Sequence, residues 1–307
     1  MTHFALSVLA LMAVQDDQAT ATLRGHTRSV HAVAISRDGK WVASGAEDAA
    51  IKLWNVEKRE AVATLEGHKG SISGLAFSPD GKRLASVEMF SLVKLWDVAS
   101  RKEISSTEGH EAAVTAVAFA PDGTSFVSVG KDKRVILWDG ETGKEKSKLA
   151  GHKHEVLDAA YSPDGKRLAT CDDGGNVLVW DLATGKAGAP LNFPDIAATA
   201  LAWSPDGATL AVALSDDSVR LIDLAGMKEK VKVADVQATR LAYAPTGRFL
   251  AAGTTENVVR ILDPATGAVR STLKGHESTV KAVAVAADGK TMATGGFDNC
   301  VRLWTVP

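Results

Sequence analysis

Histidine, hydroxyl and carboxylate side chains recur in this chain at one fixed spacing. In the first set, Ser44 follows His26 by 18 residues and Asp48 follows it by 22. These three residue types form the nucleophilic triad of many hydrolases, in which the histidine takes the proton of the hydroxyl. Two further sets keep the same spacing: His110, Ser128 and Asp132, and His276, Thr294 and Asp298.

Each set ends in a tryptophan that lies 28 residues after its histidine, at Trp54, Trp138 and Trp304. An indole N–H can only donate a hydrogen bond. A hydrolase needs one nucleophile, whereas this set recurs and always ends in an indole donor. We therefore predict a structural role for the sets and no catalytic residues.

The sets belong to a longer repeat. Gly-His dipeptides end at His26, His68, His110 and His152, which are 42 residues apart, and another ends at His276. An SPDG-like turn motif follows each of them and also occurs in two segments without Gly-His. A third marker, Trp-Asp or a variant of it, ends each segment. The three markers agree on seven units, which indicates a repeat architecture.

Within a unit the pattern is one of short strands and turns. Residues 114–119 are β-branched and aromatic, Pro-Asp-Gly follows them in a turn, and residues 126–129 and 135–138 form further strands. The last strand of a unit is rich in lysine, as in residues 144–148, which suits an exposed sheet edge. We expect four strands per unit with the polar strand outermost.

These in-phase units resemble the WD40 repeat family from Ala19 to Pro307. The resemblance implies an all-β, seven-bladed β-propeller with four antiparallel strands per blade. It also implies that the histidine, hydroxyl, aspartate and tryptophan of each complete set form a buried hydrogen-bonded tetrad that holds the loops in register. Each bond would contribute about 1 kcal/mol, and a buried partner left unpaired would cost about 1–3 kcal/mol.

The two ends of the chain indicate how the ring closes. The last unit stops just after Trp304 and lacks its outer strand, while residues 19–23 precede the first unit without a partner. We predict that this N-terminal strand pairs with the last blade. Deleting residues 19–24 should then cost more stability than trimming an ordinary terminus.

Four units depart from the tetrad. In the second and fourth units Phe90 and Gly174 occupy the aspartate position, so we predict incomplete tetrads there. In the fifth and sixth units Pro194 and Ala234 replace the histidine, and aliphatic residues replace the tryptophan. We expect these two blades to depend on apolar packing alone and to open first.

Composition limits the function classes. Of the 307 residues 45% are hydrophobic and 23% charged, with a net charge of −2, which argues against nucleic-acid binding. His152 and His154 lack a nearby third ligand, and Cys171 and Cys300 lack the paired spacing of a zinc site. We therefore predict no metal and no cofactor.

Residues 4–14 form an apolar run with the length of a signal-peptide core, followed by polar residues. We assign residues 1–18 as a signal peptide and short linker, and residues 19–307 as the propeller. The alternative is a disordered or membrane-associating extension. Export to the periplasm or the extracellular space follows from the first assignment, with no membrane segment left after cleavage, and a cytoplasmic location is the alternative.

Partners of WD40 proteins most often bind the face that carries the Gly-His loops. On that face the positions three and five after the histidine, and the one before the aspartate, are mostly small and polar. Aromatic residues, a methionine and a basic residue at or next to these positions fall on the adjacent blades seven, one and two. We predict a protein- or peptide-binding patch there: Phe297, His31, Lys281, Met89, Phe90 and Glu47. The alternative for Phe297 and Phe90 is that they only cover the turn. This favours a non-catalytic, monomeric scaffold. The alternative is an enzyme or small-ligand binder that uses the central channel.

Overall fold

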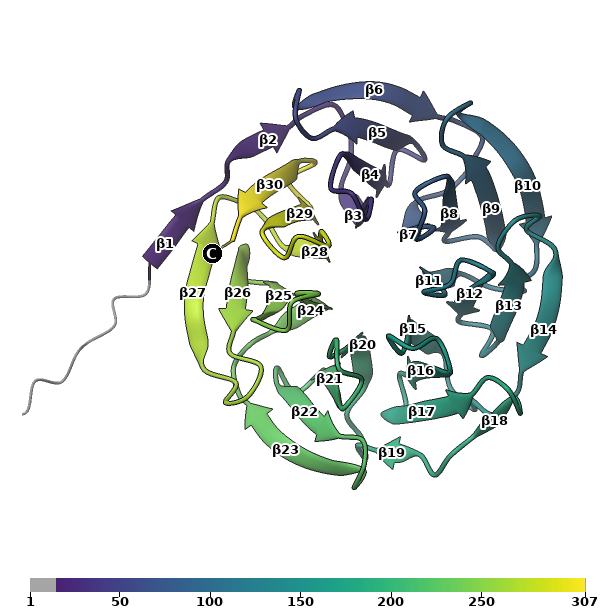
Figure 1. The fold of residues 1–307 in the computed structure, drawn as a ribbon, viewed down its shortest axis with the longest axis vertical. Helices are drawn as coiled ribbons and strands as arrows, with labels where there is room; N and C mark the ends of the chain where they lie inside the picture. The colour runs from purple at the N-terminus through teal and green to yellow at the C-terminus, as the bar shows by residue number, and fades with distance from the viewer. Residues whose placement is uncertain (1–14, 307) are drawn as a thin grey trace, which may run out of the picture.

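A computed structural model describes residues 15–306. In this range the chain forms seven small sheets arranged as the blades of a ring, as Figure 1 shows, and no helix. Consequently no helix of these residues is long and apolar enough to cross a membrane. The predicted all-β, seven-bladed propeller is confirmed.

Successive strands run outward from the centre of the ring (Figure 1). Blade one consists of β3 Val30–Ile35, β4 Trp41–Ala46, β5 Ile51–Asn55 and β6 Glu60–Leu65. Blade two consists of β7 Ile72–Phe77, β8 Arg83–Glu88, β9 Leu92–Asp97 and β10 Lys102–Glu108. Blade three consists of β11 Val114–Phe119, β12 Ser125–Gly130, β13 Val135–Asp139 and β14 Glu145–Leu149. Blade four consists of β15 Val156–Tyr161, β16 Arg167–Asp172, β17 Asn176–Asp181, β18 Lys186–Ala187 and β19 Leu191–Asn192. Blade five consists of β20 Ala198–Trp203, β21 Thr209–Leu214, β22 Val219–Asp223 and β23 Lys228–Val233. Blade six consists of β24 Ala238–Tyr243, β25 Leu250–Thr254, β26 Val258–Leu262, β27 Val269–Lys274 and β1 Gln15–Gln18. Blade seven consists of β28 Val280–Val285, β29 Thr291–Gly296, β30 Val301–Thr305 and β2 Ala21–Leu23.

The SPDG-like motifs form the turns between the first and second strands of the blades. Between β11 and β12 the Gly123 N–H donates to the Ala120 carbonyl at 2.9 Å, and Gly123 has a φ of 75°. This left-handed conformation has a steric cost for residues with a Cβ, which explains the glycine. The Asp122 carboxylate also accepts the Thr124 N–H at 2.9 Å and fixes the turn.

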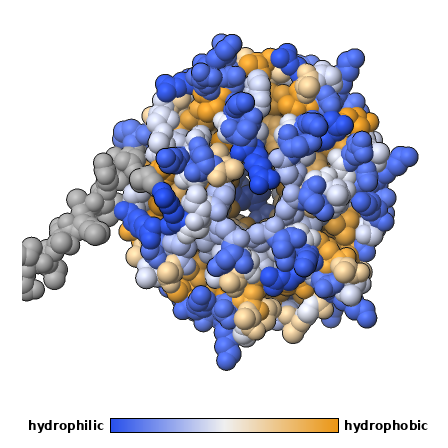
Figure 2. All heavy atoms as spheres, in the orientation of Figure 1, coloured by the Kyte–Doolittle hydropathy of each residue, from blue (hydrophilic) through white to orange (hydrophobic). Residues whose placement is uncertain are grey.

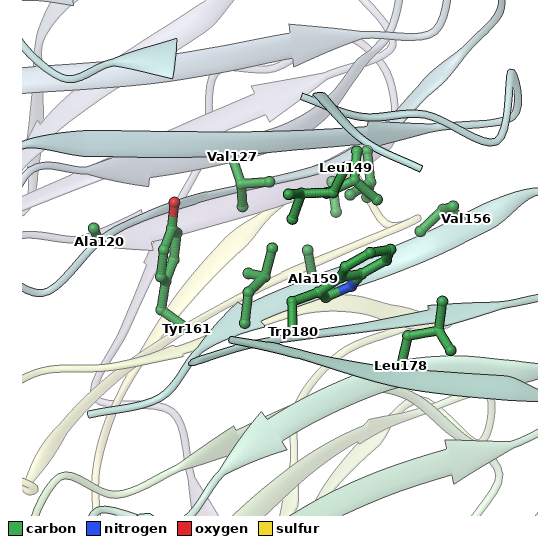
Figure 3. Close-up of a cluster of buried hydrophobic side chains, with 12 residues drawn as sticks. Ala120, Val127, Leu149, Val156, Ala159, Tyr161, Leu178 and Trp180 are labelled. Carbon is green, nitrogen blue, oxygen red and sulfur yellow. The ribbon is translucent and has the colours of Figure 1, made fainter. Parts of the chain in front are cut away.

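The core lies between neighbouring blades. Figure 3 shows Val127 of blade three facing Val156 and Trp180 of blade four, all of which are almost fully buried. Because each blade is covered on both faces by its neighbours, the second strands are buried on both faces and consist mostly of apolar or small residues. The outer strand β14 is exposed along most of its length, as its lysines suggest.

The ring closes through β2, as predicted. This strand pairs antiparallel with β30, placing Leu23 opposite Val301, and Leu23 is buried. Just before it, the N–H and hydroxyl of Thr20 both donate to the Leu303 carbonyl, at 2.8 and 2.9 Å. The last blade thus obtains its missing outer strand from the other end of the chain.

Two blades differ from the predicted arrangement of four antiparallel strands. Residues 15–18, which the sequence prediction placed in a linker, form β1 and pair in parallel with β27 of blade six. The N-terminal segment therefore connects the outer edges of blades six and seven. In blade four the outer strand is split into β18 and β19, with Pro190, which lacks an N–H for the ladder, between them. Residues 1–14, which hold the predicted signal peptide, lie outside the described residues.

Candidate functional site

The structure brings each complete set of four side chains together between the loops. In blade one the Trp54 indole donates to the Ser44 hydroxyl at 2.7 Å, and Ser44 Oγ lies 2.7 Å from His26 Nε2. On the other side of the imidazole ring, His26 Nδ1 lies 3.0 Å from Asp48. Equivalent contacts link His110, Ser128, Asp132 and Trp138, and His276, Thr294, Asp298 and Trp304.

In the blade-one tetrad, the donor of each hydrogen bond can be assigned because the indole only donates and the carboxylate only accepts. The Ser44 hydroxyl accepts from Trp54 and donates to His26 Nε2, so the Nδ1–H donates to Asp48. This requires a neutral histidine. Burial lowers the pKa of His26 even though the Asp48 charge opposes the shift, so the ring is neutral at physiological pH.

The connectivity of these groups matches that of a catalytic triad, but their accessibility does not. Ser44, Ser128 and Thr294 are each 0% exposed, and each hydroxyl accepts the N–H of a buried indole. A buried hydroxyl cannot attack an external substrate. The tetrads are therefore structural groups in this fold.

Blade two has a complete tetrad, so the prediction of an incomplete one was wrong. His68 Nδ1 lies 3.0 Å from Glu88, while its Nε2 contacts Ser86 at 2.6 Å and the Trp96 indole donates to the same hydroxyl at 2.8 Å. Glu88 also accepts the N–H groups of the loop residues Lys69 and Gly70. Burial lowers the pKa of His68 to about 4 against the opposing charge of Glu88.

Blade four is completed in the same way, by Asp172 rather than by the neighbouring Asp173. His152 Nδ1 lies 2.7 Å from Asp172, and its Nε2 contacts Thr170 at 2.6 Å. Asp172 and Glu88 both lie two residues after the hydroxyl residue of the second strand. Since side chains alternate along a strand, positions two apart point to the same face, which brings both carboxylates to the histidine.

Blades five and six have no tetrad, but apolar packing alone was also a wrong prediction. Ile222 and Leu262 are buried in the tryptophan positions. In addition, Arg220 of blade five bonds Asp216 at 2.9 Å and Glu229 at 2.7 Å. In blade six Arg260 pairs with Glu256 and donates to the Asp235 carbonyl. Partly exposed ion pairs thus add to the apolar packing of these two blades.

On the Gly-His face, the mouth of the central channel forms a cavity of about 430 Å³. All seven blades line it, mainly through the positions three and five residues after the histidine position, such as Ser73, Thr115, Thr199 and Thr239. Several of these hydroxyls donate to carbonyls of their own and the next blade; Thr115, for example, bonds Val129 and Val156. Figure 2 shows one face of the ring, hollowed at its centre and bordered there mainly by hydrophilic to neutral residues.

Four of the predicted binding residues contact one another beside this mouth. His31 Nε2 lies 2.8 Å from Glu47, and the His31 ring lies 5.1 Å from that of Phe297, centroid to centroid. Lys281 places its Nζ 6.0 Å from the centre of the Phe297 ring. Met89, on blade two, lines the same cavity and is 45% exposed. We call His31, Glu47, Met89, Lys281 and Phe297 the channel-mouth patch.

Phe90, the sixth predicted residue, lies outside the cavity lining. Its ring covers Gly70, where an added Cβ would come within 2.4 Å of the ring, and 67% of the residue is exposed. Phe90, Met89 and Phe297 are nevertheless three of the five large exposed apolar residues in the described chain, with Ile104 and Val269 as the others. Exposed apolar area is thus concentrated on blades seven and two of this face.

Sequence reasoning missed the charged residue Arg240 in the channel. It projects from β24 of blade six and bonds Asp158 of blade four at 2.8 Å, while Asp158 also accepts the Leu201 N–H at 2.9 Å. The indication available in the sequence was that blades four and six carry aspartate and arginine at an inner-strand position that is alanine or glycine in the other five blades. Over residues 15–306, no three His, Cys, Asp or Glu side chains converge as a metal site, and both ring nitrogens of His152 are used by its tetrad.

Comparison with known families agrees with the blade structure. The family model for the WD domain, G-beta repeat, matches residues 17–55, 59–97, 101–139, 143–181 and 267–305. A second model, for the anaphase-promoting complex subunit 4 WD40 domain, matches residues 188–238. The repeat model leaves residues 182–266 unmatched, which hold the short outer strands of blade four, all of blade five and the first three strands of blade six. Blades five and six are the blades without histidine and tryptophan at the tetrad positions.

Similarity to individual curated proteins is confined to short stretches. The chain is 42% identical over 50 residues to the vegetative incompatibility protein HET-E-1 of Podospora anserina, covering 16% of this chain and 4% of that protein. It is 46% identical over 35 residues to the guanine nucleotide-binding protein subunit beta of Schizosaccharomyces pombe, covering 11% of this chain and 12% of that protein. These matches span only a small part of either relative.

Proposed function

The chain belongs to the WD40 repeat family, and from this premise we propose that it is a non-catalytic, monomeric scaffold that binds a protein or peptide partner at the channel-mouth patch. Two of the proteins or domains it resembles are described as subunits, of the anaphase-promoting complex and of a guanine nucleotide-binding protein. The tetrad hydroxyls, the strongest candidates for chemistry, are inaccessible. A scaffold that presents binding surfaces accounts for these observations without requiring an accessible catalytic group.

The observation that supports the location is the grouping of exposed apolar residues with charged ones around the channel. Phe297 is 40% and Met89 45% exposed. Phe297 contacts Lys281 and His31, which pairs with Glu47, and Met89 lines the same cavity as Lys281 and His31. Aromatic residues and methionine are enriched at the centres of protein interfaces, and polar groups surround them there. The patch has this composition before any partner is bound.

Affinity capture from the native host, read by mass spectrometry, tests the proposal. We expect the double substitution Phe297→Ala with Met89→Ala to reduce capture of the main partner roughly tenfold or more. The matched control is Ile104→Ala with Val269→Ala, which removes apolar residues of similar exposure from outer strands β10 and β27. Equal capture by the patch variant and wild type, or equal losses in both variants, would contradict this location.

We also propose that residues 1–14 direct export, on the basis of their apolar run and the polar residues that follow it. Strand β1 begins at Gln15, so cleavage within residues 1–14 would leave both N-terminal strands in place. Sequencing of the mature N-terminus from the native host, with cell fractionation, tests this. A protein that retains Met1 in the cytoplasm would refute it.

A further inference from the structure

The channel-mouth patch contains a cation that no carboxylate neutralises. Lys281 projects from the inner strand β28 and is half-buried in the lining of the channel cavity. Among the side chains of residues 18–306, no aspartate or glutamate lies within ion-pair distance of its ammonium group. Its ammonium group lies over the face of Phe297, with Nζ 6.0 Å from the ring centre. A half-buried ammonium group without a counter-charge is costly, so an occupant that supplies one is favoured.

The other charged groups of the cavity are already paired or lie on another blade. Arg240 bonds Asp158, Lys131 pairs with Glu155 at 3.0 Å, and His31 bonds Glu47. Asp217 also lines the cavity, but it belongs to blade five and is exposed at the rim. Lys281 is therefore the cation left available to a ligand at the side of the mouth formed by blades six, seven and one.

Both the burial of Lys281 and the positive charge of Arg240 lower the pKa of Lys281. A carboxylate paired to the ammonium group would oppose this shift, because it stabilises the charged form. Beside it, Phe297 and Met89 offer exposed apolar surface for a neighbouring side chain of the same ligand.

We propose that the channel mouth binds an acidic peptide segment, with an aspartate or glutamate of the partner paired to Lys281 and an adjacent apolar side chain packed on Phe297 and Met89. The inference rests on the proposed scaffold function and deepens it by naming the chemistry of the partner. The charge of Lys281 selects the acidic residue, and the aromatic ring places the apolar residue beside it.

The test uses the full chain as bait for a displayed library of short random peptides. Peptides that lose binding to the Phe297→Ala variant define the ligands of the patch. We expect them to share an aspartate or glutamate next to an apolar residue. For the tightest of them, we expect Lys281→Gln to weaken binding roughly tenfold or more, the effect of losing a hydrogen bond to a charged group. Replacing the peptide's glutamate by glutamine should weaken binding to wild type equally.

A charge exchange and a matched control make the test specific. Lys281→Glu should bind the peptide whose glutamate is replaced by lysine better than it binds the original peptide. Lys290→Gln removes a lysine from the opposite end of the same blade, in the turn between β28 and β29, and should leave affinity unchanged. Thermal unfolding of each variant checks that the ring is intact.

The two proposals fail differently. Peptides that depend on Phe297 but show no acidic preference, or that bind Lys281→Gln as well as wild type, would overturn the inference and leave the scaffold proposal standing. A library that yields only peptides indifferent to Phe297→Ala would overturn the binding face itself.

Discussion

Glu88 is the most informative residue to perturb, because it completes a tetrad from an unexpected position. It is 3% exposed and accepts three hydrogen bonds, from His68 Nδ1 at 3.0 Å, the Lys69 N–H at 2.9 Å and the Gly70 N–H at 3.0 Å. Glu88→Ala leaves all three donors without a partner. At about 1 kcal/mol or more for each, the free energy of unfolding should fall by about 3 kcal/mol.

Urea and thermal unfolding followed by circular dichroism measure this loss. A decrease of about 3 kcal/mol corresponds to a melting temperature roughly 5 °C lower in a chain of this size. The control is Glu66→Ala in the same loop, which is exposed and should change stability by less than about 0.5 kcal/mol. A loss below about 1 kcal/mol for Glu88→Ala would refute the assigned role.

A compensating substitution tests the geometry as well as the energy. Adding Phe90→Asp to Glu88→Ala places a carboxylate at the position that Asp48 occupies in blade one, where it accepts from the histidine and from the Thr27 N–H at 2.9 Å. We expect part of the lost stability to return. Phe90→Asp alone, with Glu88 intact, should not stabilise the protein, so a gain from it would indicate a different mechanism.

Three further predictions follow from the closure, the histidines and the two divergent blades. Removing residues 15–24 exposes the edges of β27 and β30, so we expect a melting temperature many degrees lower in calorimetry, and unchanged melting would refute the closure. Burial lowers the pKa of His68 from 6.5 to about 4, so between these pH values the unfolded chain binds more protons than the folded one and stability falls as the pH falls. From about pH 7 to pH 5, this histidine alone should lower the free energy of unfolding by about 2 kcal/mol, as measured by urea titrations. The substitution His68→Gln should reduce this loss. Hydrogen exchange should show the amides of blades five and six opening first, since they lack tetrads, and finding them best protected would contradict this.

The sequence and the structure agree where spacing determines the contact. His26, Ser44 and Trp54 lie at intervals that repeat, and each blade places those intervals at the same points of the same strands. The tetrads of blades two and four were missed because Glu88 and Asp172 stand outside the interval of 22 residues. They could have been found from strand alternation, since each lies on the same face as its hydroxyl residue.

Contacts between blades were beyond what the repeat could predict. The Arg240–Asp158 bond joins blades six and four through the channel, and it leaves Lys281 as the cation without a carboxylate. Strand β1 pairs with blade six because the segment before the closing strand runs alongside an open edge there. Neither contact is repeated in other units, so the spacing of the repeat could not predict it. Only the unusual residue types at positions 158 and 240 could be seen in the sequence.

By itself, the sequence determined the number of blades, the closing strand and the residues of three tetrads, because these depend on local intervals repeated along the chain. The tertiary structure decided which carboxylates complete the other two tetrads, which charges remain unpaired in the channel and which apolar side chains stay exposed around it. Those outcomes depend on distances between side chains far apart in sequence, and closure of the ring sets these distances.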